Sequence, residues 1–196
     1  MNIQERAESY NRTFPKWPPV SVHDRWLHAV WILGNNYRGS GYYGSYPPNY
    51  LRRVMALFPD AKNVLHLFSG SLTPEGLSGF PGQHVRVDIN PKCKPDIVCD
   101  AVTLSSVFEE ETFDLVLADP PYSKEDAERY GVPMINRKKV LEEAAKVTTV
   151  GGNIVWLDQV APIFRKSLLH MWGLIGIFRS TNNRFRMASI FSRVGK

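Results

Sequence analysis

The residues with the clearest chemical potential form the tetrapeptide Asp119-Pro120-Pro121-Tyr122. Two consecutive prolines fix the backbone and remove two N–H donors, so the Asp119 carboxylate and the Pro120 carbonyl remain as hydrogen-bond acceptors. The aromatic ring of Tyr122 follows directly. Acceptors beside a ring suit a substrate that presents an amino group. The alternative is a plain surface turn, because turns also favour Asp and Pro.

Three further groups of residues follow predicted strands. Ser69-Gly70-Ser71 is small enough for a ligand to approach the backbone, whereas Asp88 and Asp100 are acidic. In dinucleotide folds an acidic residue at the end of the second strand binds the ribose diol. Singly, a Ser-Gly-Ser turn or a strand-terminal Asp is more often a turn or a helix cap. Because all of them follow strands, we expect one shared site.

The elements that must position these residues alternate between strand and helix from Pro47 onward. Short runs rich in β-branched residues predict strands at 63–68, 84–88, 96–99, 114–118 and 153–157. Helices are predicted over 49–58 and 136–148, the second with Asn136 as its N-cap. This alternation predicts an α/β domain with a mostly parallel sheet. The runs 174–179 and 184–191 predict an antiparallel hairpin at the end.

The first 46 residues have a different texture, rich in aromatic residues, proline and glycine. We expect an irregular N-terminal extension over 1–46 and one main domain over 47–196. Within the extension, Ser21 and Asp24 resemble a capping box, and Trp26, Val30 and Leu33 share a helical face. This spacing predicts a short helix over 22–33, with Trp26 and Trp31 in the core.

The composition of the 196 residues, 43% hydrophobic and 22% charged, is that of a globular domain. The formal net charge is +5, and no acidic residue follows Asp158. A basic end favours a polyanionic partner, although a solvated basic surface is the alternative. Two cysteines are too few for a disulfide framework, and no signal peptide or apolar run of roughly 20 residues occurs. We expect a soluble cytoplasmic protein with no membrane partner.

These motifs together resemble a known family. The chain, over about 46–191, is similar to the class I S-adenosylmethionine-dependent methyltransferases, and within them to the DNA amino-methyltransferases that act at adenine N6 or cytosine N4. Their D/N/S-P-P-Y/F signature matches Asp119–Tyr122, and their first motif is similar to 64–71. Segment 43–48 lies where members of this motif order bind the cofactor methionine. The resemblance implies a Rossmann-like fold, with a mostly parallel seven-stranded sheet and a C-terminal antiparallel hairpin.

The resemblance also implies roles for individual residues, with S-adenosylmethionine as cofactor and no metal. Asp119 and Pro120, stiffened by Pro121, bind the target amino group, and Tyr122 stacks on the extruded base. Asp88 holds the cofactor ribose and Asp100 its adenine amino group. Apart from the resemblance, the basic side chains of Arg184 and Arg186 in the last hairpin suit phosphates, so we expect Tyr122, Arg184 and Arg186 to contact nucleic acid. The full set of expected cofactor contacts is Tyr46, Pro47, Phe68, Ser69, Gly70, Ser71, Asp88, Ile89, Asp100, Ala101 and Asp119.

The expected reaction is methylation of an exocyclic amino group, with adenine N6 in DNA as the first choice. Hydrogen bonds to Asp119 and Pro120 aim the nitrogen lone pair at the methyl donor. Methylation at cytosine C5 requires a cysteine nucleophile, and neither Cys93 nor Cys99 lies in this loop. The chain has little room for a target-recognition domain, so we expect low sequence specificity or a helper protein.

Two alternatives remain open. One is an RNA base methyltransferase, because the same type of loop serves bases in RNA. The other is a catalytically idle binding subunit with the same fold. The residues after Gly70 favour it, since 71–76 lacks the second glycine of the usual G-x-G loop.

Overall fold

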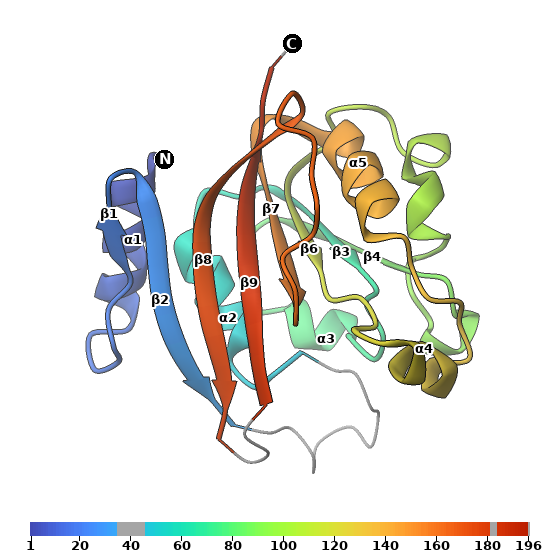
Figure 1. The fold of residues 1–196 in the computed structure, drawn as a ribbon, viewed down its shortest axis with the longest axis horizontal. Helices are drawn as coiled ribbons and strands as arrows, with labels where there is room; N and C mark the ends of the chain where they lie inside the picture. Colours follow the sequence, from blue (N-terminus) through green and yellow to red (C-terminus); the bar gives the residue numbers. More distant parts are fainter. Residues whose placement is uncertain (35–45, 181–183, 196) are drawn as a thin grey trace.

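The strands of the protein form one sheet in the order β1-β2-β8-β9-β7-β6-β3-β4-β5 (Figure 1). The computed structural model describes residues 1–34, 46–180 and 184–195. The strands are β1 (Ser21–His23), β2 (Trp26–Leu33), β3 (Asn63–Leu67), β4 (Gln83–Asp88), β5 (Ile97–Val98), β6 (Phe113–Ala118), β7 (Thr148–Asp158), β8 (Leu169–Arg179) and β9 (Arg184–Arg193). The α-helices are α1 (Ile3–Thr13), α2 (Tyr50–Leu57), α3 (Pro74–Leu77), α4 (Lys124–Tyr130) and α5 (Arg137–Val147), and the 3-10 helices are η1 (Pro91–Cys93) and η2 (Ala101–Ser106).

The predicted fold class is confirmed by the seven strands from β3 to β9. Strands β3 to β7 pair in parallel, and β9 pairs antiparallel with both β7 and β8. The predicted helices correspond to α2 and α5, and the Asn136 side chain caps α5 by accepting from the Lys139 N–H at 3.1 Å. Each predicted strand is present, with ends that differ by a few residues.

The strand order reverses at β3, which lies between β4 and β6. The chain runs from β3 outward to β4 and β5, then returns to the other side of β3 as β6. Loops that leave the carboxyl ends of β3 and β6 therefore diverge, and ligands of open α/β sheets bind at such a point. The sequence had already indicated that both loops, 68–71 and 119–122, belong to a ligand site.

The prediction for the N-terminal part is wrong where the structure describes it. Residues 22–33 form a β-hairpin instead of a helix, and helix α1 precedes it, so 1–34 is not irregular. Asp24 and Arg25 take positive φ values of 47° and 64°, which makes the tight turn between β1 and β2. Strand β2 then pairs in parallel with β8. The remaining residues of the expected extension, 35–45, lie outside the described part of the chain.

Burial explains why β2 is a strand. Leu27, Trp31 and Leu33 are buried, whereas His28, Val30 and Ile32 are exposed, which is the period of two of a sheet. The helical spacing of Trp26, Val30 and Leu33 was therefore coincidental. Trp31 is a core residue as predicted, whereas Trp26 is only partly buried.

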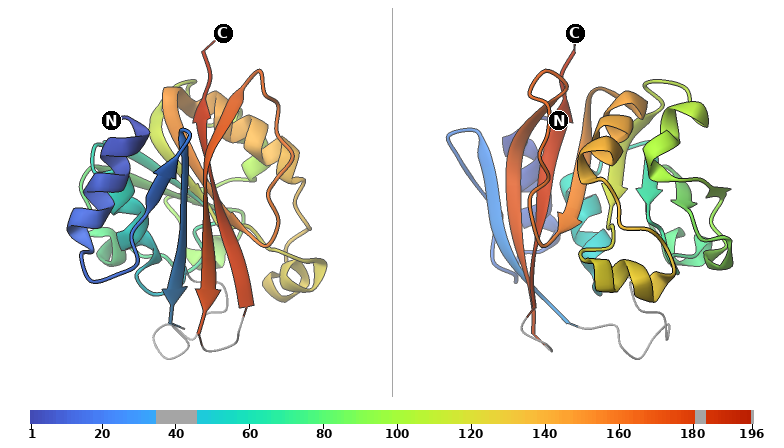
Figure 2. Two further views of the ribbon diagram at one scale, coloured as in Figure 1. Left: turned by 60° about the vertical axis from the view of Figure 1, so that its left-hand side comes forward. Right: turned by 45° about the vertical axis from the view of Figure 1, so that its right-hand side comes forward.

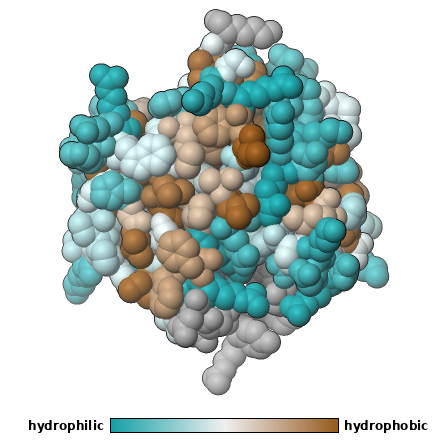
Figure 3. Space-filling view, viewed as in Figure 1, coloured by the Kyte–Doolittle hydropathy of each residue, from teal (hydrophilic) through white to brown (hydrophobic). Residues whose placement is uncertain are grey.

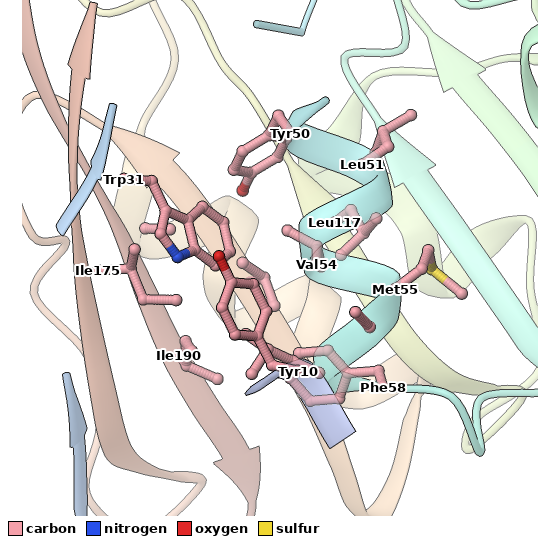
Figure 4. Close-up of a cluster of buried hydrophobic side chains, with 14 of the residues drawn as sticks. Tyr10, Trp31, Tyr50, Leu51, Val54, Met55, Phe58, Leu117, Ile175 and Ile190 are labelled. Atoms are coloured by element: carbon pink, nitrogen blue, oxygen red, sulfur yellow. The ribbon is translucent and has the colours of Figure 1, made fainter. Parts of the chain in front are cut away.

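Two hydrophobic cores lie on opposite faces of the sheet, and helices cover both faces (Figure 2). Helices α1 and α2 cover one face, where the rings of Tyr10 and Trp31 stack at 5.4 Å beside Tyr50 and Phe58 (Figure 4). Helix α5 and η2 cover the other face. Strand β6 serves both cores, since Leu115 and Leu117 belong to the first and Val116 and Ala118 to the second.

Part of the sheet carries an exposed apolar surface (Figure 3). Val30 and Ile32 of β2 and Phe185 of β9 are each more than half exposed. The connection from β7 to β8, residues 159–168, contains no helix that would cover this region. Among the described residues, no helix is long and apolar enough to span a membrane.

Candidate active site

The tetrapeptide Asp119–Tyr122 leaves the carboxyl end of β6 at the reversal of strand order. Pro120 and Pro121 are buried, whereas Asp119 and Tyr122 are partly exposed. The Tyr122 hydroxyl donates a hydrogen bond to Oδ1 of Asp119. This bond occupies one acceptor site on Oδ1, and among the contacts of the described residues Oδ2 of Asp119 and the Pro120 carbonyl accept no hydrogen bond.

The surroundings of Asp119 disfavour its charge. Burial raises the pKa of its carboxyl to about 6, against the lowering effects of Arg186 and of the hydrogen bond from Tyr122. Asp158 raises this pKa further and Arg179 lowers it. Asp119 is therefore ionised at neutral pH but takes up a proton in mild acid. A pKa close to neutrality is typical of carboxyl groups in functional sites.

An ion pair that sequence reasoning missed holds the loop in place. Arg137, the first residue of α5, donates from Nη2 to the Tyr122 carbonyl at 2.8 Å and from Nε to Oδ2 of Asp158 at 2.7 Å. Asp158, the last residue of β7, is fully buried. The acceptor loop is thus tied to two rigid elements. Asp158 follows a predicted strand directly, and this position was the signal that could have found it.

Aromatic rings and one guanidinium group surround the carboxylate. Tyr46 and Tyr50 stack at 5.3 Å, and burial together with the negative charge of Asp119 raises the pKa of both hydroxyls. Arg186 lies over the ring of Tyr122, with 4.5 Å between its Cζ and the ring centroid. One face of Tyr122 is therefore covered, and the stacking of a base on this ring stays a prediction.

The loop after β3 and the end of β4 come together as expected. The Gly70 N–H donates to Oδ2 of Asp88 at 2.8 Å, and the Asn90 N–H donates to Oδ1 of Asp88 at 2.8 Å. Each oxygen of a carboxylate accepts two hydrogen bonds, so both retain a free lone pair with respect to these contacts. Asp88 thus fixes the shape of the loop, and its contact with a ribose stays a prediction.

Backbone conformation gives this loop an unusual path. Phe68 has φ +57° and Gly70 has φ +50°, both in the left-handed region, which a bulky residue such as Phe rarely adopts. Such strain often occurs at ligand sites. Ser69 is buried, and within the part of the chain that the structure describes its Oγ has no hydrogen-bond partner. A buried hydroxyl without a partner suits a ligand that supplies one.

The other expected cofactor contacts are spread around the same edge of the sheet. Asp100 is exposed and caps η2 by accepting from the Val102 N–H at 3.1 Å, and Ala101 beside it is buried. Ile89 is 37% exposed and Ser71 is half-buried. Tyr46 and Pro47 precede α2, and the buried Tyr46 hydroxyl has no hydrogen-bond partner in the described ranges 1–34, 46–180 and 184–195. Residues 43–45 of the expected methionine-binding segment lie outside the described part of the chain.

The two arginines predicted to contact phosphates lie in different environments. Arg186 is only 7% exposed, whereas Arg184 is exposed. Arg184 lines a cavity of about 330 Å³ beside the acceptor loop. The other residues that line this cavity are Ser123, Glu125, Asp126, Arg129, Gln159 and Phe185. Arg186 is therefore a residue of the site interior, and Arg184 is a residue of its rim.

Comparisons with known proteins identify the fold. No protein-family model and no curated protein matches the sequence. Among solved structures, TrmN from Thermus thermophilus superposes with a TM-score of 0.60 at 16% identity, over 77% of this chain and 50% of that chain. The 1,6-didemethyltoxoflavin-N1-methyltransferase of Burkholderia thailandensis, solved with S-adenosylhomocysteine, superposes with a TM-score of 0.51 at 11% identity, over 72% of this chain and 76% of that chain.

The chain thus spans about half the length of the TrmN structure. At these identities the likeness concerns the fold alone. The seven strands from β3 to β9, with β9 antiparallel to its neighbours, are consistent with this likeness of fold. The protein has the class I S-adenosylmethionine-dependent methyltransferase fold.

Proposed function

We propose that this protein transfers a methyl group from S-adenosylmethionine to an exocyclic amino group of a nucleic-acid base, with adenine N6 in DNA as the preferred target. One observation carries the proposal. Leu67 pairs with Ala118 at the ends of β3 and β6, so the loops that begin with Phe68 and Asp119 leave neighbouring strands. Adjacent parallel strands lie about 4.8 Å apart, which brings the expected cofactor loop and the acceptor loop into one site.

The residues of the first loop fit the cofactor. Ser69 offers a buried hydroxyl that lacks a hydrogen-bond partner, and Gly70 allows close approach of a ligand to the backbone. In this proposal Phe68, Ser69 and Gly70 line the methionine part and Asp88 binds the ribose, with Asp100 and Ala101 at the adenine. S-adenosylmethionine, when bound, supplies the methyl group on its sulfonium.

The acceptor loop binds and orients the amine. An exocyclic amine is a weak nucleophile because its lone pair is conjugated with the ring. Its two N–H groups donate to Asp119 Oδ2 and to the Pro120 carbonyl, which directs the lone pair toward the methyl donor. The methylated nitrogen must then lose a proton, and a carboxylate with a pKa of about 6 is suited to accept it.

The test is transfer of tritium from labelled S-adenosylmethionine to DNA, to RNA and to a reaction without nucleic acid. We expect DNA to be labelled; label in RNA alone would identify an RNA base as the substrate. Cofactor binding by calorimetry without transfer to any acceptor would identify the protein as an idle binding subunit. Failure to bind the cofactor at all would refute the proposal.

Asp119→Ala separates binding from chemistry. We expect it to lower the rate of transfer at least about 100-fold while cofactor affinity stays within about twofold. Asp24→Asn is the matched control, because this carboxylate is exposed in the turn between β1 and β2. Unchanged transfer by Asp119→Ala would remove Asp119 from the mechanism.

A further inference from the structure

Three arginines of the β8–β9 hairpin lie on one face of the sheet. Arg179 pairs with Arg184, and Ile177 pairs with Arg186. Residues directly opposite each other in an antiparallel pair share a face, as do residues two apart in one strand. Ile177 belongs to the core beneath α1 and α2, so the three arginines are on the side of Tyr50 and the acceptor loop.

Arg179 and Arg186 are both close enough to Asp119 to lower the pKa of its carboxyl. Each of them has a buried Nε with no hydrogen-bond partner among the residues that the structure describes. Neither forms an ion pair with any residue that the structure describes. A buried guanidinium without an anionic partner is costly, so this arrangement calls for an explanation.

Asp119 supplies one negative charge near the two arginines, and the sequence segments around the cluster supply no second one. No acidic residue lies between Asp24 and Asp60, and none follows Asp158. Asp158 itself is paired with Arg137. Burial is the main cause that lowers the pKa of Arg179, and the charges of Arg186 and Arg184 lower it as well, whereas Tyr122 and Asp119 raise it. An anionic ligand would relieve both the repulsion and the unmet hydrogen bonding.

We propose that Arg179 and Arg186 form a subsite for a phosphate group of the acceptor, beside the Asp119–Tyr122 loop. Guanidinium groups bind phosphate with two parallel N–H bonds. The Cζ of Arg186 lies 4.5 Å from the centroid of the Tyr122 ring, so this guanidinium group lies directly beside the acceptor loop. Arg184, exposed at the rim, extends the positive surface outward.

This inference rests on the proposed function and sharpens it. A phosphate held beside Asp119 means that the acceptor is a nucleotide and not a neutral nucleoside or an uncharged small molecule. The phosphate of a mononucleotide and the phosphodiester of a strand share this chemistry. Comparison of both with the nucleoside identifies which one the site accepts.

The experiment measures kcat/KM with deoxyadenosine, with its 5′-monophosphate and with a short single-stranded oligonucleotide that contains one adenine. We expect at least about a tenfold preference for an acceptor with phosphate. Arg179→Gln and Arg186→Gln remove most of this preference, so that in each variant kcat/KM with the nucleotide falls to within about threefold of kcat/KM with the nucleoside. Lys166→Gln, which removes an exposed charge before the start of β8, keeps the preference. Equal use of nucleoside and nucleotide by the wild type would overturn the proposal.

A binding measurement keeps the subsite testable apart from the reaction. We expect calorimetry to detect inorganic pyrophosphate binding to the wild-type protein and to Lys166→Gln, but not to the two arginine variants. If no acceptor is methylated and pyrophosphate still binds in this way, the proposed function fails and the anion subsite stands. Absence of pyrophosphate binding by the wild type would refute the subsite. Because Arg186 is buried, Arg179→Gln, at a less buried position, tests the subsite even if Arg186→Gln fails to fold.

Discussion

The hydroxyl of Tyr122 donates a hydrogen bond to the carboxylate of Asp119, three residues earlier in the chain. Burial raises the pKa of Asp119 to about 6, and the bond from Tyr122 acts in the opposite direction. The tetrapeptide therefore contains both the acceptor group and a residue that adjusts its charge. The effect of burial and the effect of the Tyr122 hydrogen bond on the pKa of Asp119 can each be measured in a variant.

The rate of methyl transfer depends on the charge of Asp119. Below a pH of about 6 the carboxyl is protonated, so it loses an acceptor position, and above that pH it is ionised. We expect kcat to rise through a pH of about 6 and to level off on the alkaline side. The profile is measured with saturating substrates from about pH 5 to about pH 8.5. A flat profile in which chemistry limits the rate would contradict the assignment.

Asp119→Asn should stabilise the fold at neutral pH even though it abolishes transfer. The pKa of Asp119 is raised in the folded protein, so its contribution to stability is favourable below its ordinary pKa of 3.8 and is lost as the pH rises through about 6. Asparagine carries no charge at any of these pH values, so the variant does not lose stability as the pH rises. We expect a gain on the order of 2 kcal/mol at neutral pH and little change in acid, measured by urea unfolding at the two pH values. The same difference at both pH values would argue against a raised pKa.

Tyr122→Phe removes the hydrogen bond that lowers the pKa of Asp119. We expect the acidic limb of the kcat profile to move to higher pH, while affinity for the cofactor stays the same because the ring is retained. The shift is read from pH profiles of variant and wild type collected side by side. An unmoved limb would mean that the bond has no influence on the reacting carboxylate.

Arg137→Ala should destabilise the protein strongly. It leaves the fully buried carboxylate of Asp158 without its partner, which costs about 3 to 5 kcal/mol, and it releases the carbonyl of Tyr122. Arg165→Ala is the control, since the Arg165 side chain is 59% exposed in its pair with Glu142, and such a pair contributes about 1 kcal/mol or less. Urea unfolding measures both. In Arg137→Ala/Asp158→Asn the second change removes the unpaired charge, so part of the stability returns.

Local patterns in the sequence were enough to predict most of the main sheet. The strands from β3 to β9, the capped helix α5 and the closing hairpin all depend on turn chemistry, capping and β-branched runs within a few residues. The Asp119–Tyr122 loop was found in the same way, since two prolines between an acid and an aromatic residue have a local chemical meaning. Positions at strand ends also predicted that Gly70 and Asp88 would meet.

Residues 22–33 show where local patterns fail. The spacing of Trp26, Val30 and Leu33 fits a helix. The spacing of Leu27, Trp31 and Leu33 fits a strand, so spacing alone does not decide between the two secondary structures. The strand is selected by pairing with β8, whose residues come more than 100 positions later in the chain. Hydrogen bonding of the β2 backbone and burial of Trp31 against Tyr10 depend on that assembled sheet and on α1.

The sequence by itself determined the local elements and the residue types at the ends of the strands. Only the tertiary structure decided that Arg186 is buried over Tyr122, that Arg137 neutralises Asp158, and that Asp119 has a raised pKa. Each of these facts joins residues from different strands or helices. Removal of water and the distances between charges depend on how those elements pack, and residue spacing along one chain does not contain that information.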